Sequence, residues 1–391
     1  MCRIIPSNQR IGIVVKIIRR YPLTIIYSIV VIAFLAAYFC KEDTAFLDGE
    51  NRYLTTRPDI SLDGIMDASF MKSFESYTED QLYLREAFIE LKSLLETACL
   101  KQENNGIVCG KNGYLFEKLM MPGKQINKNE AAIKNFADSI NRDVNVCIVP
   151  NSIEINRSLA PVGLRCVNQK KEIDSFYNML ADMKNVNVID VYSGLAEHSD
   201  EYIYYKTDHH WTTLGAYYGY ADIIKSMNGK PVEISTLANN SKQVNDFYGT
   251  FNSKYKGIGI EPDVMTYYDI PVESYTVGEK KYDNLYDFSK LDTYDKYAMF
   301  LYGNEGISVI KSADSNNSVD EAKRLVVFKD SYANCMIPFM TYNYDEIIVV
   351  DLRFYGESVS NLLQQYEDAD VLLMYNFSFF NEDNHIYRLT S

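Results

Sequence analysis

The sequence is poor in basic residues and in the spacings that build metal centres. Its 391 residues include 39 Lys and Arg against 53 Asp and Glu, a formal net charge of −14. Because a nucleic-acid partner needs a basic surface, we expect none here. The seven cysteines have neither a CxxC pair nor Cys/His ligand spacing, which argues against a zinc site. Their odd number and wide scatter argue against a disulfide framework.

Long uncharged apolar runs are also scarce, so the run at residues 23–39 stands out. Its length suits a bilayer-spanning helix, and Lys41-Glu42-Asp43 follows it. Basic residues precede it, and such a flank stays in the cytoplasm: Arg3, Arg10, Lys16, Arg19 and Arg20. A cleaved signal peptide is the alternative, but residues 36–40 lack a convincing small-x-small cleavage site. We predict a cytoplasmic tail (1–22) and one uncleaved transmembrane anchor (23–40) in the cell membrane, with the remainder extracellular.

The remaining sequence alternates between helical and strand patterns, which is typical of an α/β fold with a parallel sheet. A helical stripe at 67–100 falls within a membrane-proximal segment, 41–104, and a hairpin at 106–118 turns at 111–113. Residues 230–295 are rich in Tyr, Gly and Asp, and we interpret them as an insertion that shapes a cleft in a 105–391 domain. Further helices are predicted at 131–141, 173–183, 213–227, 332–342 and 358–366. Strands are predicted at 144–149, 186–190, 297–302, 307–310, 325–328, 347–350 and 371–374.

Two motifs contain groups suited to proton transfer. The stretch 204–211, Tyr-Tyr-Lys-Thr-Asp-His-His-Trp, holds two of the four histidines and the only tryptophan. The second motif is an apolar strand that runs into Asp330-Ser331, where a doubly wound sheet places reactive groups. A serine hydroxyl needs a neighbouring base, which either histidine offers, and Asp208 would fix the tautomer of that histidine. The alternatives are surface histidines at a helix N-terminus and a serine that caps a helix.

These motifs resemble the DHHW proteins of bacteria, which are similar to the alginate acetylation proteins of the SGNH hydrolase/acyltransferase superfamily. The resemblance implies a flavodoxin-like parallel sheet flanked by helices, circularly permuted because the Asp-His pair precedes the serine. In the alginate acetylation proteins the motif is Asp-x-His-Trp, which maps onto Asp208, His210 and Trp211. Residues two apart in an extended loop also share a side, which favours His210 over His209. Further segments carry the resemblance: Glu50-Asn51-Arg52 with Pro58, residues 74–85, residues 110–116 and Lys329-Asp330-Ser331-Tyr332.

The predicted site therefore has Ser331, His210 and Asp208 as catalytic residues, with no metal or cofactor. In SGNH enzymes an asparagine follows the third strand counted from the serine strand, and this resemblance implies Asn376 for the oxyanion hole, beside the Ser331 N–H. The alternative is an asparagine that ends a strand in a turn. Arg353 is expected either to orient an anionic substrate or to pair with Asp351. His209 is expected either to line the substrate cleft or to cap the following helix, and Trp211 is expected at the oxyanion or substrate site.

The resemblance implies transfer of an acetyl group to a cell-surface polysaccharide through an acyl-serine. It also implies a partner, a membrane-bound O-acyltransferase that exports the acyl group. Two alternatives stay open: an acetylesterase acting on the same polymers, and a non-catalytic polysaccharide-binding or assembly component.

Overall fold

The computed structural model describes residues 19–47, 52–313 and 322–391, in two compact units that divide between Lys92 and Ser93. Glu50, Asn51 and the basic residues before Arg19 lie outside the described residues. The apolar run forms α2 (Pro22–Cys40), which begins with proline in its first turn, where a missing N–H costs nothing. The helix is long and apolar enough to cross a membrane, a test that a signal sequence also passes.

The rest of the first unit holds two of the segments that carry the resemblance. The Arg52 guanidinium binds the Asp80 carboxylate at 2.6 Å, and its hydrogen bond lowers the pKa of Asp80 to about 2. The helical stripe predicted at 67–100 is confirmed as two helices, which are interrupted before Arg85 where Leu84 has a φ of 59°. The elements are β1 (Phe46–Leu47), β2 (Arg52–Tyr53), α3 (Leu62–Met66) and α4 (Ser69–Asp80). The helix α5 (Arg85–Ala98) begins in this unit and ends in the second.

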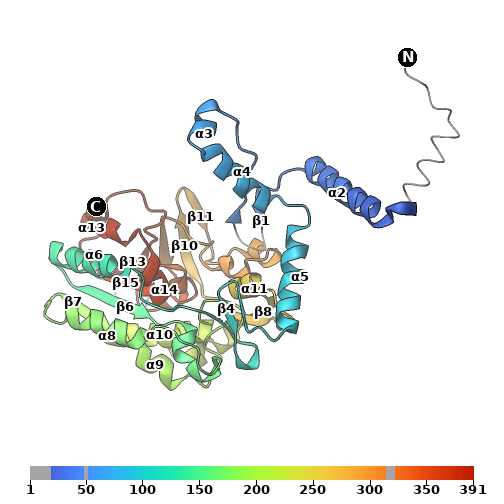
Figure 1. Ribbon diagram of the computed structural model, residues 1–391. Helices are drawn as coiled ribbons and strands as arrows, with labels where there is room; N and C mark the ends of the chain where they lie inside the picture. Colours follow the sequence, from blue (N-terminus) through green and yellow to red (C-terminus); the bar gives the residue numbers. More distant parts are fainter. Residues whose placement is uncertain (1–18, 48–51, 314–321) are drawn as a thin grey trace, which may run out of the picture. The chain divides into compact units, whose positions relative to one another are not determined.

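In the second unit, the described residues form an eight-stranded sheet in the order β11-β10-β12-β14-β13-β15-β6-β7. Figure 1 labels β10, β11, β13, β15, β6 and β7 of this sheet. The strands from β14 to β7 run parallel, whereas β12, β10 and β11 extend the β14 edge antiparallel. Counted from β13, the parallel strands lie in the order 2-1-3-4-5, which is that of flavodoxin-like sheets. Their bounds are β6 (Val144–Val149), β7 (Val186–Ile189), β13 (Arg324–Lys329), β14 (Glu346–Val350) and β15 (Asp370–Asn376).

Apolar residues cover both faces of this sheet because successive strand side chains point to opposite sides. In β13, Leu325 and Val327 join one core with Trp211, whereas Val326 and Phe328 join the other. Against the first core lies α10 (Thr213–Ser226), and Gly219 allows its close approach because a Cβ there would lie 2.6 Å from the Trp211 ring. Against the second core lie α6 (Ile126–Ser139), α8 (Gln169–Leu180) and α13 (Val359–Gln365).

Most predicted elements are confirmed to within a few residues, including the hairpin of β4 (Ile107–Cys109) and β5 (Leu115–Glu117). Two predictions are wrong. Residues 297–302 form no strand, because η6 (Lys296–Met299) occupies the first half and Leu301 and Tyr302 have φ values of 52° and 57°. The helix predicted at 332–342 is split into η7 (Ser331–Cys335) and α12 (Ile337–Met340), since Pro338 fits only the first turn of a helix.

The segment predicted as an insertion contributes to the sheet and to a separate hairpin. Its strands β10 (Val272–Val277) and β11 (Lys280–Tyr282) reach the sheet through β12 (Ile307–Ser312). A second pair, β8 (Ser241–Phe247) and β9 (Asp263–Tyr268), forms its own antiparallel hairpin, with α11 (Thr250–Tyr255) between the two strands. Other short elements are β3 (Glu103–Asn104), α7 (Ser152–Ile155), α9 (Tyr192–Glu197) and α14 (Phe377–Glu382).

Candidate active site

The loop that carries the two adjacent histidines is held by a buried carboxylate from the insertion. Asp263, at the start of β9, accepts hydrogen bonds from the Lys206 N–H at 2.9 Å and the Thr207 N–H at 2.8 Å. It also accepts from the Thr207 hydroxyl at 2.6 Å. A bridge between Tyr204 and Trp211 closes the loop. The loop is therefore fixed at its base before the histidines begin.

Asp208, His210 and Ser331 form a continuous chain of hydrogen bonds. The Asp208 carboxylate lies 2.6 Å from Nδ1 of His210, and Nε2 of the same ring lies 2.8 Å from Oγ of Ser331. Asp208 also accepts from the His210 N–H at 3.0 Å, which sets the direction of the ring. Asp208 and His210 are buried, whereas Ser331 is half-buried. This is the geometry of a nucleophile, a base and an orienting acid.

Ser331 follows β13 at the carboxyl edge of the sheet, and it does not cap the following turn. Asp330 is the N-cap of η7, and its carboxylate accepts from the Tyr332 N–H at 2.8 Å. The alternative in which Ser331 caps a helix is therefore wrong. With Asp330 in that role, the Ser331 hydroxyl is turned to His210.

The insertion also clamps Asp208 from the side opposite His210. The second oxygen of Asp208 accepts from the Thr250 N–H at 2.7 Å and from the Thr250 hydroxyl at 3.1 Å. Gly249 packs so closely that a Cβ there would lie 2.2 Å from the Asp208 Cβ. Both carboxylate oxygens are therefore committed, and the side chain has one position.

The electrostatics of the site keep His210 neutral and Asp208 charged. Burial lowers the pKa of His210 to about 4, and the neighbouring His209 adds to this shift. Burial by itself would raise the pKa of Asp208, but the charges and hydrogen bonds of the two histidines hold it well below its usual value. His209 has its pKa raised by Asp208, which outweighs the opposing effect of burial. At neutral pH, His210 therefore carries a free lone pair on Nε2.

Aromatic rings fix the His210 imidazole. Tyr297 stacks on it with ring centroids 3.7 Å apart and planes 11° from parallel, and its hydroxyl donates to the Ser331 carbonyl at 3.0 Å. The Trp211 indole N–H donates to the Tyr332 carbonyl at 2.8 Å. Trp211 is completely buried, so it supports the turn behind Ser331 and presents no surface to a substrate.

Asn376, expected in the oxyanion hole, and Arg353, expected to orient a substrate or to pair with Asp351, both bind carboxylates. The Asn376 side-chain amide and backbone N–H each donate to Asp330 at 2.7 Å. Arg353 binds Asp351 through two nitrogens, at 2.9 and 2.6 Å, and lies over the Phe379 ring. Of the two roles expected for Arg353, the structure has the ion pair with Asp351. Both residues lie at the carboxyl edge of the sheet, as predicted.

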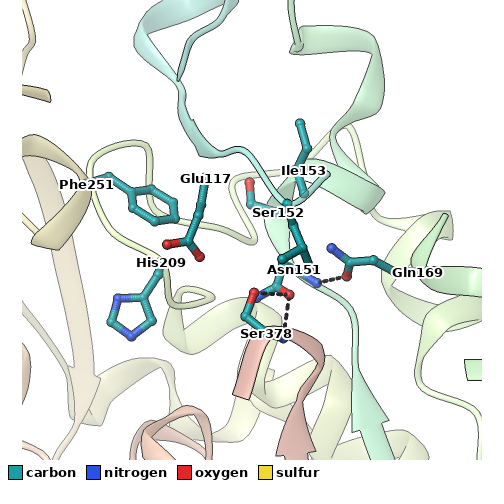
Figure 2. Close-up of a pocket in the computed structure, with 9 residues that line it drawn as sticks. Glu117, Asn151, Ser152, Ile153, Gln169, His209, Phe251 and Ser378 are labelled. Atoms are coloured by element: carbon teal, nitrogen blue, oxygen red, sulfur yellow. Dashed lines mark hydrogen bonds between the residues drawn. The ribbon is translucent and has the colours of Figure 1, made fainter. Parts of the chain in front are cut away.

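His209 lines a pocket that His210 does not reach (Figure 2), although the two rings lie with their centroids 3.7 Å apart. Its Nδ1 lies 2.7 Å from the Thr250 hydroxyl, and Thr212, not His209, caps α10. Asp208, His209 and His210 offer three possible metal-ligand atoms within 4.8 Å of one another. However, both Asp208 oxygens already accept N–H groups and Nε2 of His210 faces Ser331, so this donor set suits proton transfer better than a tetrahedral zinc.

Comparison with known proteins decides the family. A family model described as DHHW protein matches residues 108–350, more than half of the chain. The chain belongs to the DHHW family. The resemblance drawn from the motifs is thereby confirmed. No curated protein matches the sequence.

Solved structures of another DHHW family protein and of PatB1 share the fold of this DHHW protein. It is similar to a DHHW family protein from Eubacterium siraeum, with 25% identity and a TM-score of 0.61 over 73% of this chain and 95% of that one. Bacillus cereus PatB1 has 21% identity and a TM-score of 0.58, and the match covers 72% of this chain and 98% of PatB1. A PatB1 structure with a sulfonyl adduct is also similar. The O-acetyltransferase domain of Pseudomonas putida AlgJ is more distant, with 13% identity and a TM-score of 0.41 over 71% and 93%.

Sequence reasoning about this DHHW protein missed the residues that support the predicted triad. Thr250 and Tyr297 lie far along the chain from Asp208 and His210, in segments that carry no motif. Asn151 was also missed, although it follows β6 at the same edge of the sheet as Asn376. The sequence signal that could have identified Asn151 is a polar residue just after a buried parallel strand.

Proposed function

We propose that this DHHW protein is a serine-dependent O-acyltransferase that acetylates a cell-surface polysaccharide. The observation that carries the proposal is the hydrogen-bonded chain from Asp208 through His210 to a half-buried Ser331. The choice of an acetyl group and a polysaccharide rests on the resemblance to alginate acetylation proteins. Within this proposal, α2 anchors the protein in the cell membrane and the remainder of the chain lies outside the cell.

In the proposed reaction, Ser331 Oγ attacks the acyl carbonyl carbon of the donor while neutral His210 accepts the serine proton at Nε2. Asp208 stabilises the imidazolium that forms. The tetrahedral intermediate expels the donor alcohol, which takes the proton from His210 and leaves an acyl-serine. A sugar hydroxyl then attacks the acyl carbon, gives its proton to His210 and releases Ser331, whose oxygen recovers that proton.

The developing oxyanion needs donors aimed at it. We assign this role first to the Ser331 N–H, because it opens η7 and the first N–H groups of a helical turn have no partner within it. Asn376 is proposed as a positioning residue, since its amide binds Asp330 and so steadies the turn that carries Ser331. Arg353, about a quarter exposed, is proposed to attract an anionic group of donor or acceptor.

We further infer an SGNH-like catalytic domain that is circularly permuted. The strand order supports this, because the flavodoxin-like order is recovered when counting begins at the serine strand. The proposed organisation is a basic tail (1–22), an anchor (23–40), a membrane-proximal segment (41–104) and the catalytic domain (105–391). A membrane-bound O-acyltransferase is the proposed source of acyl groups.

The proposal is tested with Ser331→Ala in the full-length protein. A sulfonyl fluoride should label the wild type and the exposed-serine control Ser360→Ala, but not Ser331→Ala. With an acetyl donor ester and envelope oligosaccharides, wild type should yield acetylated sugar and Ser331→Ala should yield none. Free acetate as the only product across a panel of acceptors would replace the transferase with an esterase. Equal labelling of wild type and Ser331→Ala would remove the proposed nucleophile.

A further inference from the structure

The ring of Tyr297 lies flat against the imidazole of His210. The two ring centroids are 3.7 Å apart, and the ring planes are 11° from parallel. Because carbon atoms in contact are already about 3.5–4.0 Å apart, almost the whole centroid separation is the distance between the planes. The rings therefore overlap face to face with little lateral offset. Both residues are buried, with 4% of each exposed.

This face-to-face overlap is a poor arrangement for two neutral aromatic rings. A neutral ring has partial negative charge on its faces and partial positive charge at its edge. Aromatic pairs therefore prefer offset stacks or edge-to-face contacts, with centroids about 4.5–7 Å apart. A cation over the face of a tyrosine ring is instead attracted by the negative charge of that face. The contact between Tyr297 and His210 is therefore more favourable when His210 is an imidazolium.

Three further contacts hold the Tyr297 ring in place. Its hydroxyl donates to the Ser331 carbonyl at 3.0 Å. The rings of Tyr205 and Phe300 lie next to it, with centroids 6.5 and 5.2 Å away, and Tyr205 meets it at 83°. The ring is therefore already in position when charge develops on His210. Such preorganisation is what makes electrostatic stabilisation effective in a buried site.

In the proposed reaction His210 changes charge, because it takes the Ser331 proton at Nε2 and becomes an imidazolium. Burial opposes this change and lowers the pKa of His210, and His209, whose ring centroid is 3.7 Å away, lowers that pKa further. Asp208 favours the imidazolium through its hydrogen bond to Nδ1 at 2.6 Å. The face of the Tyr297 ring is a second group that favours it.

We propose that Tyr297 stabilises the imidazolium form of His210 through a cation–π contact and so lowers the barrier to attack by Ser331. This inference rests on the proposed function and adds a positioning residue that acts through His210. An interaction that is stronger in the transition state than in the ground state raises kcat, whereas equal binding of both does not. Tyr297 therefore acts on kcat and leaves KM nearly unchanged.

The test changes the charge on the face of the ring and keeps its shape. Tyr297→Phe is made in the full-length protein, followed by the same substitution with 4-fluoro, 3,5-difluoro and 3,4,5-trifluoro phenylalanine. Each fluorine withdraws electrons from the ring face. For hydrolysis of 4-nitrophenyl acetate, log kcat should fall steadily with the number of fluorines. The total loss between Tyr297→Phe and its trifluoro analogue should be about ten- to thirty-fold.

Tyr218 supplies the matched control. Its ring stacks on His198 with the same centroid separation of 3.7 Å and with planes 5° from parallel. This pair has the same ring geometry but no part in the hydrogen-bonded chain to Ser331. The fluorinated series at Tyr218 should therefore leave kcat unchanged.

The second readout follows the charge of His210 without turnover. Histidine labelled with 13C at Cε1 gives one NMR signal for each of the four histidines, and His210→Gln identifies the signal of His210. Because a weaker attraction disfavours the imidazolium, the pKa of His210 should fall as fluorines are added at position 297. Asp208, His209 and Arg353 also act on this pKa and are the same throughout the series.

An unchanged His210 pKa across the series would overturn the inference, and so would a kcat that does not follow the number of fluorines. A loss in Tyr297→Phe that fluorination does not deepen would assign the effect to the hydroxyl at the Ser331 carbonyl. A protein that keeps its activity in Ser331→Ala would instead remove the proposed function, and the NMR titration would still decide the contact between Tyr297 and His210.

Discussion

Replacement of Asp208 by Asn removes the negative charge beside His210 without changing the size of the side chain. In the wild type both carboxylate oxygens accept from N–H groups, one from His210 and the other from Thr250. Asn has only one oxygen, so its NH₂ group must face a donor in either orientation. Facing His210, it would force the proton onto Nε2, which could then no longer accept from Ser331. Facing Thr250, it would oppose a backbone N–H at 2.7 Å.

Either orientation of the Asn side chain impairs His210 as a general base more than it impairs substrate binding. Comparable substitutions in serine triads lower kcat by about 10⁴ through the wrong tautomer, which corresponds to about 5 kcal/mol of transition-state stabilisation. We expect a loss of about 10³ to 10⁴ in kcat for Asp208→Asn, with little change in KM, because Asp208 is buried and does not contact a substrate.

The assay is hydrolysis of 4-nitrophenyl acetate, followed together with the rate of labelling by a sulfonyl fluoride. Asp269→Asn makes the same chemical change at an exposed position of the insertion and serves as the control. Thermal unfolding of each variant separates a catalytic loss from a folding defect. A folded Asp208→Asn protein that retains more than a tenth of the wild-type kcat would refute the role assigned to Asp208.

The site supports further predictions. His210→Ala should cost several orders of magnitude in kcat and His209→Ala much less, and the reverse ranking by ester hydrolysis would move the base to His209. Because the pKa of His210 is lowered to about 4, kcat/KM for a neutral ester should stay flat from pH 7 to about 5 and fall near pH 4 as the base is protonated. An acid limb near pH 6.5 would contradict this. The folded fraction should be followed by circular dichroism, since a His210 pKa below the unfolded value makes stability fall as pH drops from about 6.5 toward 4. Gly249→Ala should reduce kcat strongly because its Cβ would displace Asp208, whereas Gly356→Ala, with no neighbour within 4 Å, should not. Protease added to intact cells should digest the chain beyond α2, and complete protection would refute the extracellular assignment.

The sequence alone was sufficient for the elements whose signal is local. Strand β6 occupies 144–149 as predicted, and β13, β14 and β15 end within two residues of their predicted positions, because a buried parallel strand is a short apolar run bounded by polar residues. Asp330-Ser331 at the end of β13 could be recognised for the same reason. The Asp-His-His-Trp motif identified the family, and the match of the family model to residues 108–350 confirms it.

Only the tertiary structure decided how those residues are used. Asp330, and not Ser331, caps η7. The Asn376 side-chain amide donates to Asp330 because the carboxyl ends of β13 and β15 lie side by side. The clamp on Asp208 comes from Thr250, 42 residues away, and the partner of His210 lies 121 residues away. Such contacts depend on how strands and loops pack in three dimensions, and local periodicity contains no information about them. The predicted strand at 297–302 failed for the same reason: packing against His210 holds Tyr297 in a turn that its β propensity opposes.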